Sequence, residues 1–401
     1  RVNIDGDSYK TAGDPFLEET ATEQMKENYG ELLKDLYSVF VRDISAGRSW
    51  NEEETKDIIN MGPYYHSDKV VSSGLVTDIM YPDEFENHLK EMMSCKDDQD
   101  KKSKCDTKYT IVNWKEVDRS REYVSDWSPK EKNNIALIYA VGGIMPGKSQ
   151  KGPSGSSVMG DETISEAIKS ARQNGDIDAI VLRIDSGGGS AFASDQMWHE
   201  IELTTNNEDS TKNKPFIASM SDVAASGGYY IACNADKIIA NDATVTGSIG
   251  VIGLNLNTSI LWKNIGVNKE VVAKEGANAD FYTTSRLRNE YETEKMEESI
   301  NSIYKTFKNR VIDGRVGLTD IDKLDDIAMG RVWTGSKAQE HLLVDEIGGI
   351  NDAIILAAEA AGIKDLDNIN VIEYPKNDIS ENIKSLSDLS TQLFLNSIPS
   401  E

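Results

Sequence analysis

The sequence predicts an α/β fold in which mostly parallel strands are covered by helices. Apolar segments of strand length alternate with segments whose apolar residues recur at helical spacing, and this alternation is typical of βαβ units. A turn rich in glycine or serine follows each strand. Functional residues in such sheets gather at the carboxyl ends of the strands, so these turns are the candidate functional positions.

The expected elements begin with the longest apolar run of the chain, IALIYAVGGIM. In chain order we expect a strand at Ile135–Met145, a helix at Glu162–Arg172, a strand at Ile177–Ile184, a helix at Asp195–Leu203, and strands at Pro215–Met220 and Lys237–Ala240. Near the C-terminus, Ile379–Leu395 has apolar residues at helical spacing and is expected to be a packing helix. Its polar face is not basic, which argues against a membrane-surface role.

An internal repeat indicates how the chain is organised. Tyr37 and Phe40 match Tyr304 and Phe307 at one constant offset along the chain. Six further residues recur at an offset that is longer by a single position, among them Met61-Gly62, which matches Met329-Gly330. We therefore expect two copies of one unit of about 260 to 270 residues, the size of a large single domain, with only the C-terminal third of the first copy present. The expected parts are the first copy at residues 1–91, a polar linker or insertion at 92–132, the complete second copy at 133–378, and a C-terminal helix and tail at 379–401.

The composition excludes several classes of function. The 401 residues include 68 acidic and 43 basic side chains, so the formal net charge is −25. This excess of acid argues against binding to nucleic acid or to anionic lipid. No run of about 18 apolar residues is present, as a membrane-spanning helix would need. The three cysteines are too few for a disulfide scaffold or a cysteine-rich metal site, and Cys95 and Cys105 are either a local disulfide or two exposed thiols.

Three motifs follow expected strands: RIDSGGGS, SDVAASGG and TVTGSIG. Gly187, Gly188 and Gly189 form an unbroken glycine turn, which allows a backbone N–H to approach a ligand closely. Ser226 has small neighbours and lies at the start of an expected helix, where developing negative charge is favoured. The alternatives are ordinary turn chemistry for the glycines and an N-cap role for the serine. Neither GxGxxG, a P-loop nor the GxSxG elbow occurs at these places.

A nucleophilic serine needs a base. The four histidines, His66, His88, His199 and His341, lie near no recognisable triad signature. A lysine can replace histidine because burial lowers its pKa toward neutrality. Residue types alone leave many lysines as candidates.

The three motifs, in this order and spacing, resemble those of the S49 family of serine proteases. The opening segment SYKTAGDPF resembles the segment that supplies the general-base lysine in the long form of the family, which has two tandem copies of one domain. The resemblance runs from Lys10 to about Asp378. It implies a crotonase-like, ClpP-like spiral of βαβ units, here a tandem repeat whose first copy is incomplete.

The resemblance also implies roles for individual residues. Ser226 would be the nucleophile, Lys10 its general base, and Ser248 a hydrogen-bond partner that orients the lysine. The backbone N–H groups of Gly189 and Gly227 would form the oxyanion hole. The neighbouring glycines of the same turn would contact the substrate: Gly187 and Gly188.

This sequence departs from the family pattern in two places. Asp185 and Gly187 stand where the family usually has asparagine and proline, which adds an anion near the expected oxyanion and loosens the turn. Lys274, in KEGANADF, occupies a position similar to that of Lys10 in KTAGDPF. It is the alternative base, because single-copy relatives supply the base from this position across a subunit contact.

The resemblance implies a serine endopeptidase that degrades cleaved signal peptides and similar apolar peptides, with no cofactor. It further implies a homo-oligomeric, tetrameric ring, anchored in a bacterial cytoplasmic membrane by a segment upstream of Arg1, with the catalytic body on the periplasmic side. Two alternatives remain open on the same fold: a crotonase-type acyl-CoA enzyme that uses an oxyanion hole without a serine nucleophile, and a catalytically weak scaffold. Covalent labelling of Ser226 discriminates among the three.

Overall fold

The computed structural model describes residues 2–3, 9–62, 64, 67–93, 133–151, 157–206, 213–254, 257–269, 280–321 and 323–375. The chain packs as two compact units. The first comprises Arg1–Tyr37 and Glu131–Glu401, and the second comprises Ser38–Lys130. The dividing line falls within the long helix α1 (Glu23–Arg48). The segment that carries Lys10 therefore belongs to the same unit as the three glycine- and serine-rich motifs.

The first unit is built on an eight-stranded sheet with the main order β11-β9-β7-β6-β2-β13, in which β8 pairs with β7 and β12 pairs with β8. All pairs in this sheet are parallel except β11 with β9. The strands are β2 (Asn133–Val141), β6 (Ala179–Ser186), β7 (Phe216–Ala225), β8 (Lys237–Ala240), β9 (Val245–Gly247), β11 (Val332–Thr334), β12 (Glu346–Ile347) and β13 (Ile369–Tyr374). The α/β class expected from the sequence is confirmed.

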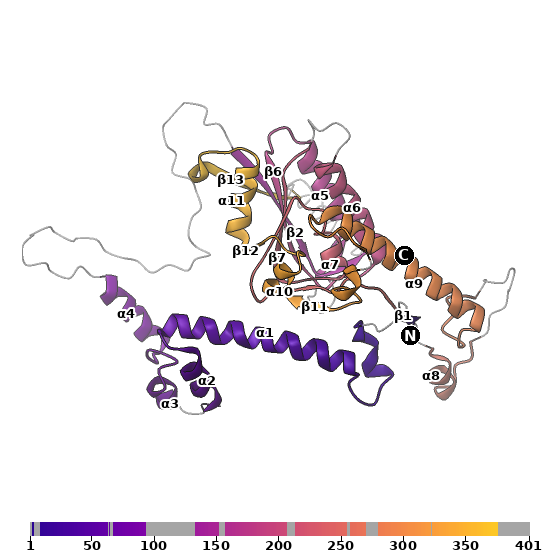
Figure 1. Ribbon diagram of the computed structural model, residues 1–401, viewed down its shortest axis with the longest axis horizontal. Helices are drawn as coiled ribbons and strands as arrows, with labels where there is room; N and C mark the ends of the chain where they lie inside the picture. The colour runs from indigo at the N-terminus through magenta and orange to yellow at the C-terminus, as the bar shows by residue number, and fades with distance from the viewer. Residues whose placement is uncertain are drawn as a thin grey trace, which may run out of the picture. The chain divides into compact units, whose positions relative to one another are not determined.

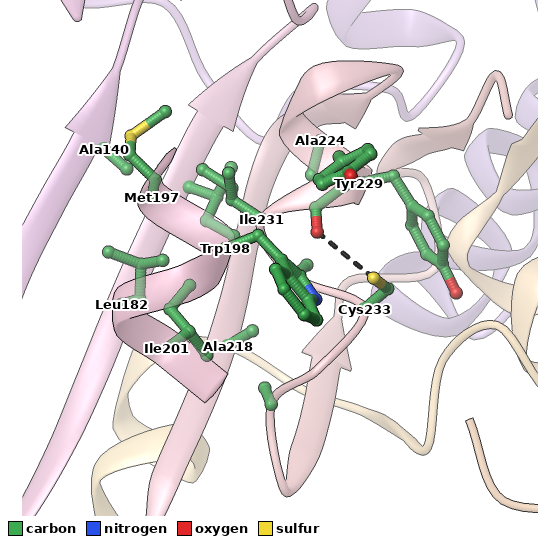
Figure 2. Close-up of a cluster of buried hydrophobic side chains, with 14 of the residues drawn as sticks. Ala140, Leu182, Met197, Trp198, Ile201, Ala218, Ala224, Tyr229, Ile231 and Cys233 are labelled. Carbon is green, nitrogen blue, oxygen red and sulfur yellow. Dashed lines mark hydrogen bonds between the residues drawn. The ribbon is translucent and has the colours of Figure 1, made fainter. Parts of the chain in front are cut away.

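Two layers of helices cover this sheet, as Figure 1 shows. Helices α5 (Asp161–Gln173) and α6 (Ala191–Thr205) pack on one face, and α11 (Ile350–Ala360) packs on the other. Successive strand residues point to opposite faces, so the apolar run of each central strand supplies both cores. Figure 2 shows the larger core, in which Met197, Trp198 and Ile201 of α6 lie against residues of the central strands, among them Leu182 and Ala218.

The strand β7 brings the three motifs together. Its first half pairs with β8 and its second half pairs with β9, while β6 runs along its other side. The carboxyl ends of β6, β7 and β9 therefore lie next to one another. These are the ends that lead into the glycine turn, Ser226 and Ser248, and parallel pairing places the three turns at one edge of the sheet.

The structure divides one expected strand into two. The run expected at Ile135–Met145 is interrupted at Gly142, whose φ is +103°. A Cβ at this position would lie 2.0 Å from the carbonyl oxygen of Ser157, so only glycine permits the approach. Beyond it, β3 (Gly143–Met145) joins a small sheet of order β3-β5-β4. The other strands of the unit are β4 (Gln150–Lys151), β5 (Ser157–Gly160), β1 (Val2–Asn3) and β10 (Ile252–Gly253), of which the last two pair with each other.

The helices recur at the two offsets on which the repeat prediction rests. Helix α9 (Glu290–Gly314) begins after α1 by the same interval that separates Tyr37 from Tyr304. Helices α10 (Gly335–Glu340) and α11 begin after α3 (Ser67–Ser72) and α4 (Pro82–Met93) by the interval that separates Met61 from Met329. The remaining helices are α2 (Glu52–Asn60), α7 (Gly227–Tyr230), α8 (Ser259–Asn264) and the 3-10 turns at Thr11–Phe16, Lys323–Asp326 and Leu366–Asn368.

The second unit contains the end of α1 and the short helices α2, α3 and α4. The Ser45 and Thr55 hydroxyls lie 2.8 Å apart in its interior, and Arg48 donates a hydrogen bond of 2.7 Å to the carbonyl of Leu75. Helix α4 extends to Met93, just past the expected start of the linker. The expected Cys95–Cys105 contact and the C-terminal helix lie outside the described residues. Within the described part of the chain, no helix is both long and apolar enough to cross a bilayer.

Candidate active site

Ser226 occupies a strained turn between β7 and α7. Its backbone angles are φ 55° and ψ −120°, a combination that a residue with a side chain rarely adopts. Although Ser226 is the N-cap residue of α7, its side chain makes no capping hydrogen bond. The capping alternative therefore fails, and the hydroxyl is directed elsewhere. A sharp strand-to-helix turn that exposes a serine is also the geometry of the nucleophile elbow, reached here without its GxSxG sequence.

The Lys10 ammonium lies between two serine hydroxyls. Its Nζ is 2.9 Å from Ser226 Oγ and 2.9 Å from Ser248 Oγ. Burial of the ammonium lowers the pKa of Lys10 from its usual value near 10.5 to about 8, because a charged amine loses hydration in the interior. Three residues far apart in the sequence thus form one contiguous hydrogen-bonded set.

Ser248 is fixed through its backbone and its hydroxyl. It is buried and has a positive φ of 51°. Its N–H donates to the carbonyl of Arg331 at 2.6 Å, and its Oγ lies 3.5 Å from the carbonyl oxygen of Gly330. A hydroxyl that donates to Gly330 presents its lone pairs to Lys10.

Close backbone contacts enclose the Lys10 side chain, and sequence reasoning did not single them out. A Cβ at Gly330, whose φ is +86°, would lie 2.6 Å from Lys10 Cγ. A Cβ at Gly250 would lie 3.4 Å from Lys10 Cε. Glycine at both positions lets the lysine approach the backbone. The available signal was the repeat, in which Met329-Gly330 matches an earlier Met-Gly pair.

The glycine turn lies directly against Ser226. A Cβ at Gly188, whose φ is +94°, would lie 2.6 Å from the Gly227 nitrogen. Gly189 forms a parallel bridge with Ile144 in which Gly188 O and Ser190 N make the hydrogen bonds. In such a bridge the N–H of the middle residue, here Gly189, points away from the partner strand.

The N–H of Gly227 is the second donor at this place. Gly227 is the first residue of α7, and a helix provides no internal acceptor for the N–H groups of its first turn. Gly189 and Gly227 both line the cavity at Ser226. Gly187 makes no close contact, because nothing lies within 4 Å of its hypothetical Cβ.

The first family departure is answered by pairing. Asp185 Oδ1 accepts a hydrogen bond of 3.3 Å from the Val223 N–H. The carboxylate also interacts favourably with the Arg183 guanidinium on the same strand. Ser186 holds the turn, since it donates to Gly142 O at 2.7 Å and accepts from Gly188 N at 3.1 Å. The extra anion is therefore neutralised locally.

An apolar cavity of about 270 Å³ opens beside Ser226. One wall is a face of α9, which presents Met296, Ile300, Ile303 and Phe307 at helical spacing. The Tyr230 ring packs against Phe307 with the ring centres 4.7 Å apart. The lining is completed by Lys10, Gly189, Ala191, Ser194, Ser226, Gly227, Gly250, Val251, Ile252, Gly253 and Ser299.

The remaining candidate residues do not join this site. None of the described histidines, His88, His199 and His341, lines the cavity. Lys274 lies outside the described residues. In the part of the chain that the structure describes, no group of three or more histidine, cysteine or carboxylate side chains is arranged to hold a metal ion.

Comparisons with known proteins agree with this site. The sequence profile of peptidase family S49 matches residues 208–364. The chloroplastic serine protease SPPA of Arabidopsis thaliana is 34% identical over 366 residues, which are 91% of this chain and 51% of that protein. A protein of Synechocystis sp. whose name classes it as a protease is 35% identical over 199 residues, which are 49% of this chain and 69% of that protein.

Among solved structures, ClpP1 from Listeria monocytogenes covers 55% of this chain and 93% of its own length, with 14% identity and a TM-score of 0.34. The chain spans about half the length of the curated relatives that match most of it. The sequence profile and the match over more than two thirds of the Synechocystis protein show that this chain belongs to peptidase family S49.

Proposed function

We propose that this chain is a serine endopeptidase in which Ser226 is the nucleophile and Lys10 is the general base. The observation that carries the proposal is the position of Lys10 Nζ, 2.9 Å from both Ser226 Oγ and Ser248 Oγ. A lysine acts as a base only when it is neutral, and burial lowers the pKa of Lys10 to about 8. Neither a histidine nor a metal ion is needed for this chemistry.

In the proposed reaction the neutral Lys10 amine accepts the proton of Ser226 Oγ as the oxygen attacks a peptide carbonyl. Ser248 accepts a hydrogen bond from the same amine and so keeps its lone pair directed at the nucleophile. The resulting ammonium then gives its proton to the leaving amine, and an acyl-enzyme remains. A water molecule activated by Lys10 releases the acyl group and regenerates the serine.

The oxyanion that forms during each step would be held by two backbone donors, the N–H groups of Gly189 and Gly227. Backbone donors fixed in a turn do not reorganise during the reaction, which is why such sites stabilise developing charge effectively. The start of α7 adds a favourable dipole at the same place. Gly187 and Gly188 would contact the substrate backbone beside this hole.

The proposed substrates are apolar peptides, such as signal peptides that have been cleaved from their precursors. The support is the cavity beside Ser226, whose α9 wall is formed by aliphatic and aromatic side chains. We also propose, from the family alone, that the chain works as a homo-oligomeric ring, a tetramer, on the outer side of a bacterial cytoplasmic membrane. Sedimentation of the protein in detergent tests the assembly.

The proposed function is tested by labelling the full chain with a fluorophosphonate probe and locating the adduct by peptide mass spectrometry. We expect the adduct at Ser226, and we expect Ser226→Ala to lose both the adduct and the hydrolysis of an apolar peptide ester. Ser170→Ala, a serine on α5 that contacts Glu166, is the matched control and keeps both. Peptide-ester hydrolysis that survives in Ser226→Ala contradicts the proposal. An unlabelled, inactive wild-type chain favours the acyl-CoA or scaffold alternatives.

A further inference from the structure

Tyr9, the residue before the proposed base, is held by contacts at both its backbone and its side chain. It donates its backbone N–H to the carbonyl of Met329 at 2.8 Å. Its hydroxyl donates to Glu27 Oε2 at 3.0 Å and accepts a hydrogen bond of 2.8 Å from Arg331. The Tyr9 backbone and side chain are therefore fixed independently, and the next residue along the chain is Lys10.

Arg331 contacts both partners of the proposed base. Its guanidinium carbon lies 3.8 Å from the centre of the Tyr9 ring, and its Nη1 lies 3.4 Å from Glu27 Oε1. The carbonyl oxygen of the same residue accepts the 2.6 Å hydrogen bond from Ser248 N. One residue thus connects the backbone that carries Lys10 with the backbone that carries Ser248.

Glu27 is itself anchored. It lies on α1 beside Asn28, which is buried. The Asn28 side-chain amide exchanges two hydrogen bonds of 3.1 Å with the N–H and C=O of Val332 on β11. This pairing fixes α1 against the strand that follows Arg331, so Glu27 and Arg331 face Tyr9 from adjacent, mutually fixed positions.

We propose that Arg331 is a positioning residue that sets Lys10 against Ser226 and Ser248, through its contacts with Tyr9 and through its own carbonyl group. The inference rests on the proposed function of Lys10 as the base. Arginine suits this place because its planar guanidinium stacks on an aromatic face while its edge makes directed hydrogen bonds. Lysine offers a point charge without a fixed fork, so it replaces the charge and not the geometry.

The test compares the full-length wild type with Arg331→Met, Arg331→Lys and Tyr9→Phe. Tyr9→Phe keeps the aromatic ring and removes only the hydroxyl, so it tests the contact even if Arg331→Met does not fold. Arg172→Met is the matched control, because Arg172 forms a comparable ion pair with Glu200 on α5 and α6, away from the site. The first readout is the pH dependence of kcat/KM for an apolar peptide ester.

We expect Arg331→Met to lower kcat by about 10- to 100-fold, as misplacement of a reacting group by about 1 Å does, with KM changed by less than about threefold. The acid limb of the pH profile should move upward by about one unit, because an amine that gains solvent recovers part of its ordinary basicity. Arg331→Lys should resemble Arg331→Met, Tyr9→Phe should show a smaller shift in the same direction, and Arg172→Met should leave the profile unchanged.

A second readout does not depend on activity. Competitive acetylation of the lysines at several pH values, followed by peptide mass spectrometry, gives the basicity and accessibility of the Lys10 amine directly. We expect both to rise in Arg331→Met and Tyr9→Phe relative to Lys169, a surface lysine. An unchanged Lys10 in folded variants overturns the positioning role. If the wild type does not hydrolyse the ester, the proposed function fails, and the acetylation result still decides whether Arg331 positions Lys10.

Discussion

The two sides of Ser226 are built in different ways. On one side, Lys10 and Ser248 act through side chains, and they meet Ser226 although they come from distant parts of the sequence. On the other side, Gly188 and Gly189 lie in one turn directly after β6, and only their backbone faces the serine. The base side depends on tertiary packing, whereas the glycine side depends on the local conformation of one loop.

This difference separates the expected effects of substitution. A change on the base side alters proton transfer, and therefore the pH dependence of the reaction. A change on the glycine side alters stabilisation of the oxyanion, which lowers the rate at every pH without moving the profile. The predictions below use this contrast, and each variant is expected to disturb one side only.

The largest effect is expected for Lys10→Met, which keeps the length of the side chain and removes the amine. We expect kcat/KM for an apolar peptide ester to fall by about 10³-fold, within the range of general-base contributions. In the wild type, activity should be low below pH 8 and rise to a plateau above it, because the neutral amine is the active form and its pKa is lowered by burial to about 8. This rise should be absent in the variant.

The matched control for this variant is Lys169→Met, which changes an exposed lysine on α5 and should leave both the rate and the profile unchanged. Rates measured from pH 6 to 10 distinguish the outcomes. A Lys10→Met enzyme with a wild-type profile would assign the base to another group, with Lys274 of a second copy as the first candidate.

The next effect, on the glycine side, is expected for Gly189→Ala. The new Cβ would lie 2.1 Å from the carbonyl oxygen of Ile144 at a φ of +157°, so the turn must move. We expect kcat to fall by about 10²-fold, as for loss of one oxyanion donor, while the pH profile keeps its wild-type midpoint. Gly175→Ala, in a turn with nothing within 4 Å of the new Cβ, is the control. A shifted midpoint in Gly189→Ala would contradict the separation of the two sides.

The sequence predicted the glycine side better than the base side, for a physical reason. The turns after β6, β7 and β9 were recognisable because strand periodicity and glycine composition are local properties. Their meeting at one edge follows from parallel pairing. The break at Gly142 was missed, because it results from contact with Ser157, a residue on another strand.

The base side needed information that one segment does not contain. Nothing in residue types alone distinguished Lys10 from the other lysines, and only the family resemblance selected it. The contacts that enclose it come from Gly330 and Arg331, in a much later part of the chain, and from Tyr9, whose role depends on both. Such contacts arise from tertiary packing, so periodicity and spacing do not report them.

The smallest effect is expected for Gly187→Pro, which introduces the residue that the family usually has in this turn. Gly187 has nothing within 4 Å of its hypothetical Cβ and is not among the residues with positive φ, so the ring has space. Proline removes conformational freedom from the unfolded chain, which typically stabilises a protein by about 0.4–1 kcal/mol at a compatible site. We expect the melting temperature to rise by a few degrees at most and kcat to rise about twofold, because a stiffer turn holds Gly189 more firmly. Thermal unfolding and single-turnover acylation measure the two. A kcat loss of tenfold or more would mean that the Gly187 N–H, which proline lacks, binds the substrate. The glycine side would then depend on three backbone donors instead of two.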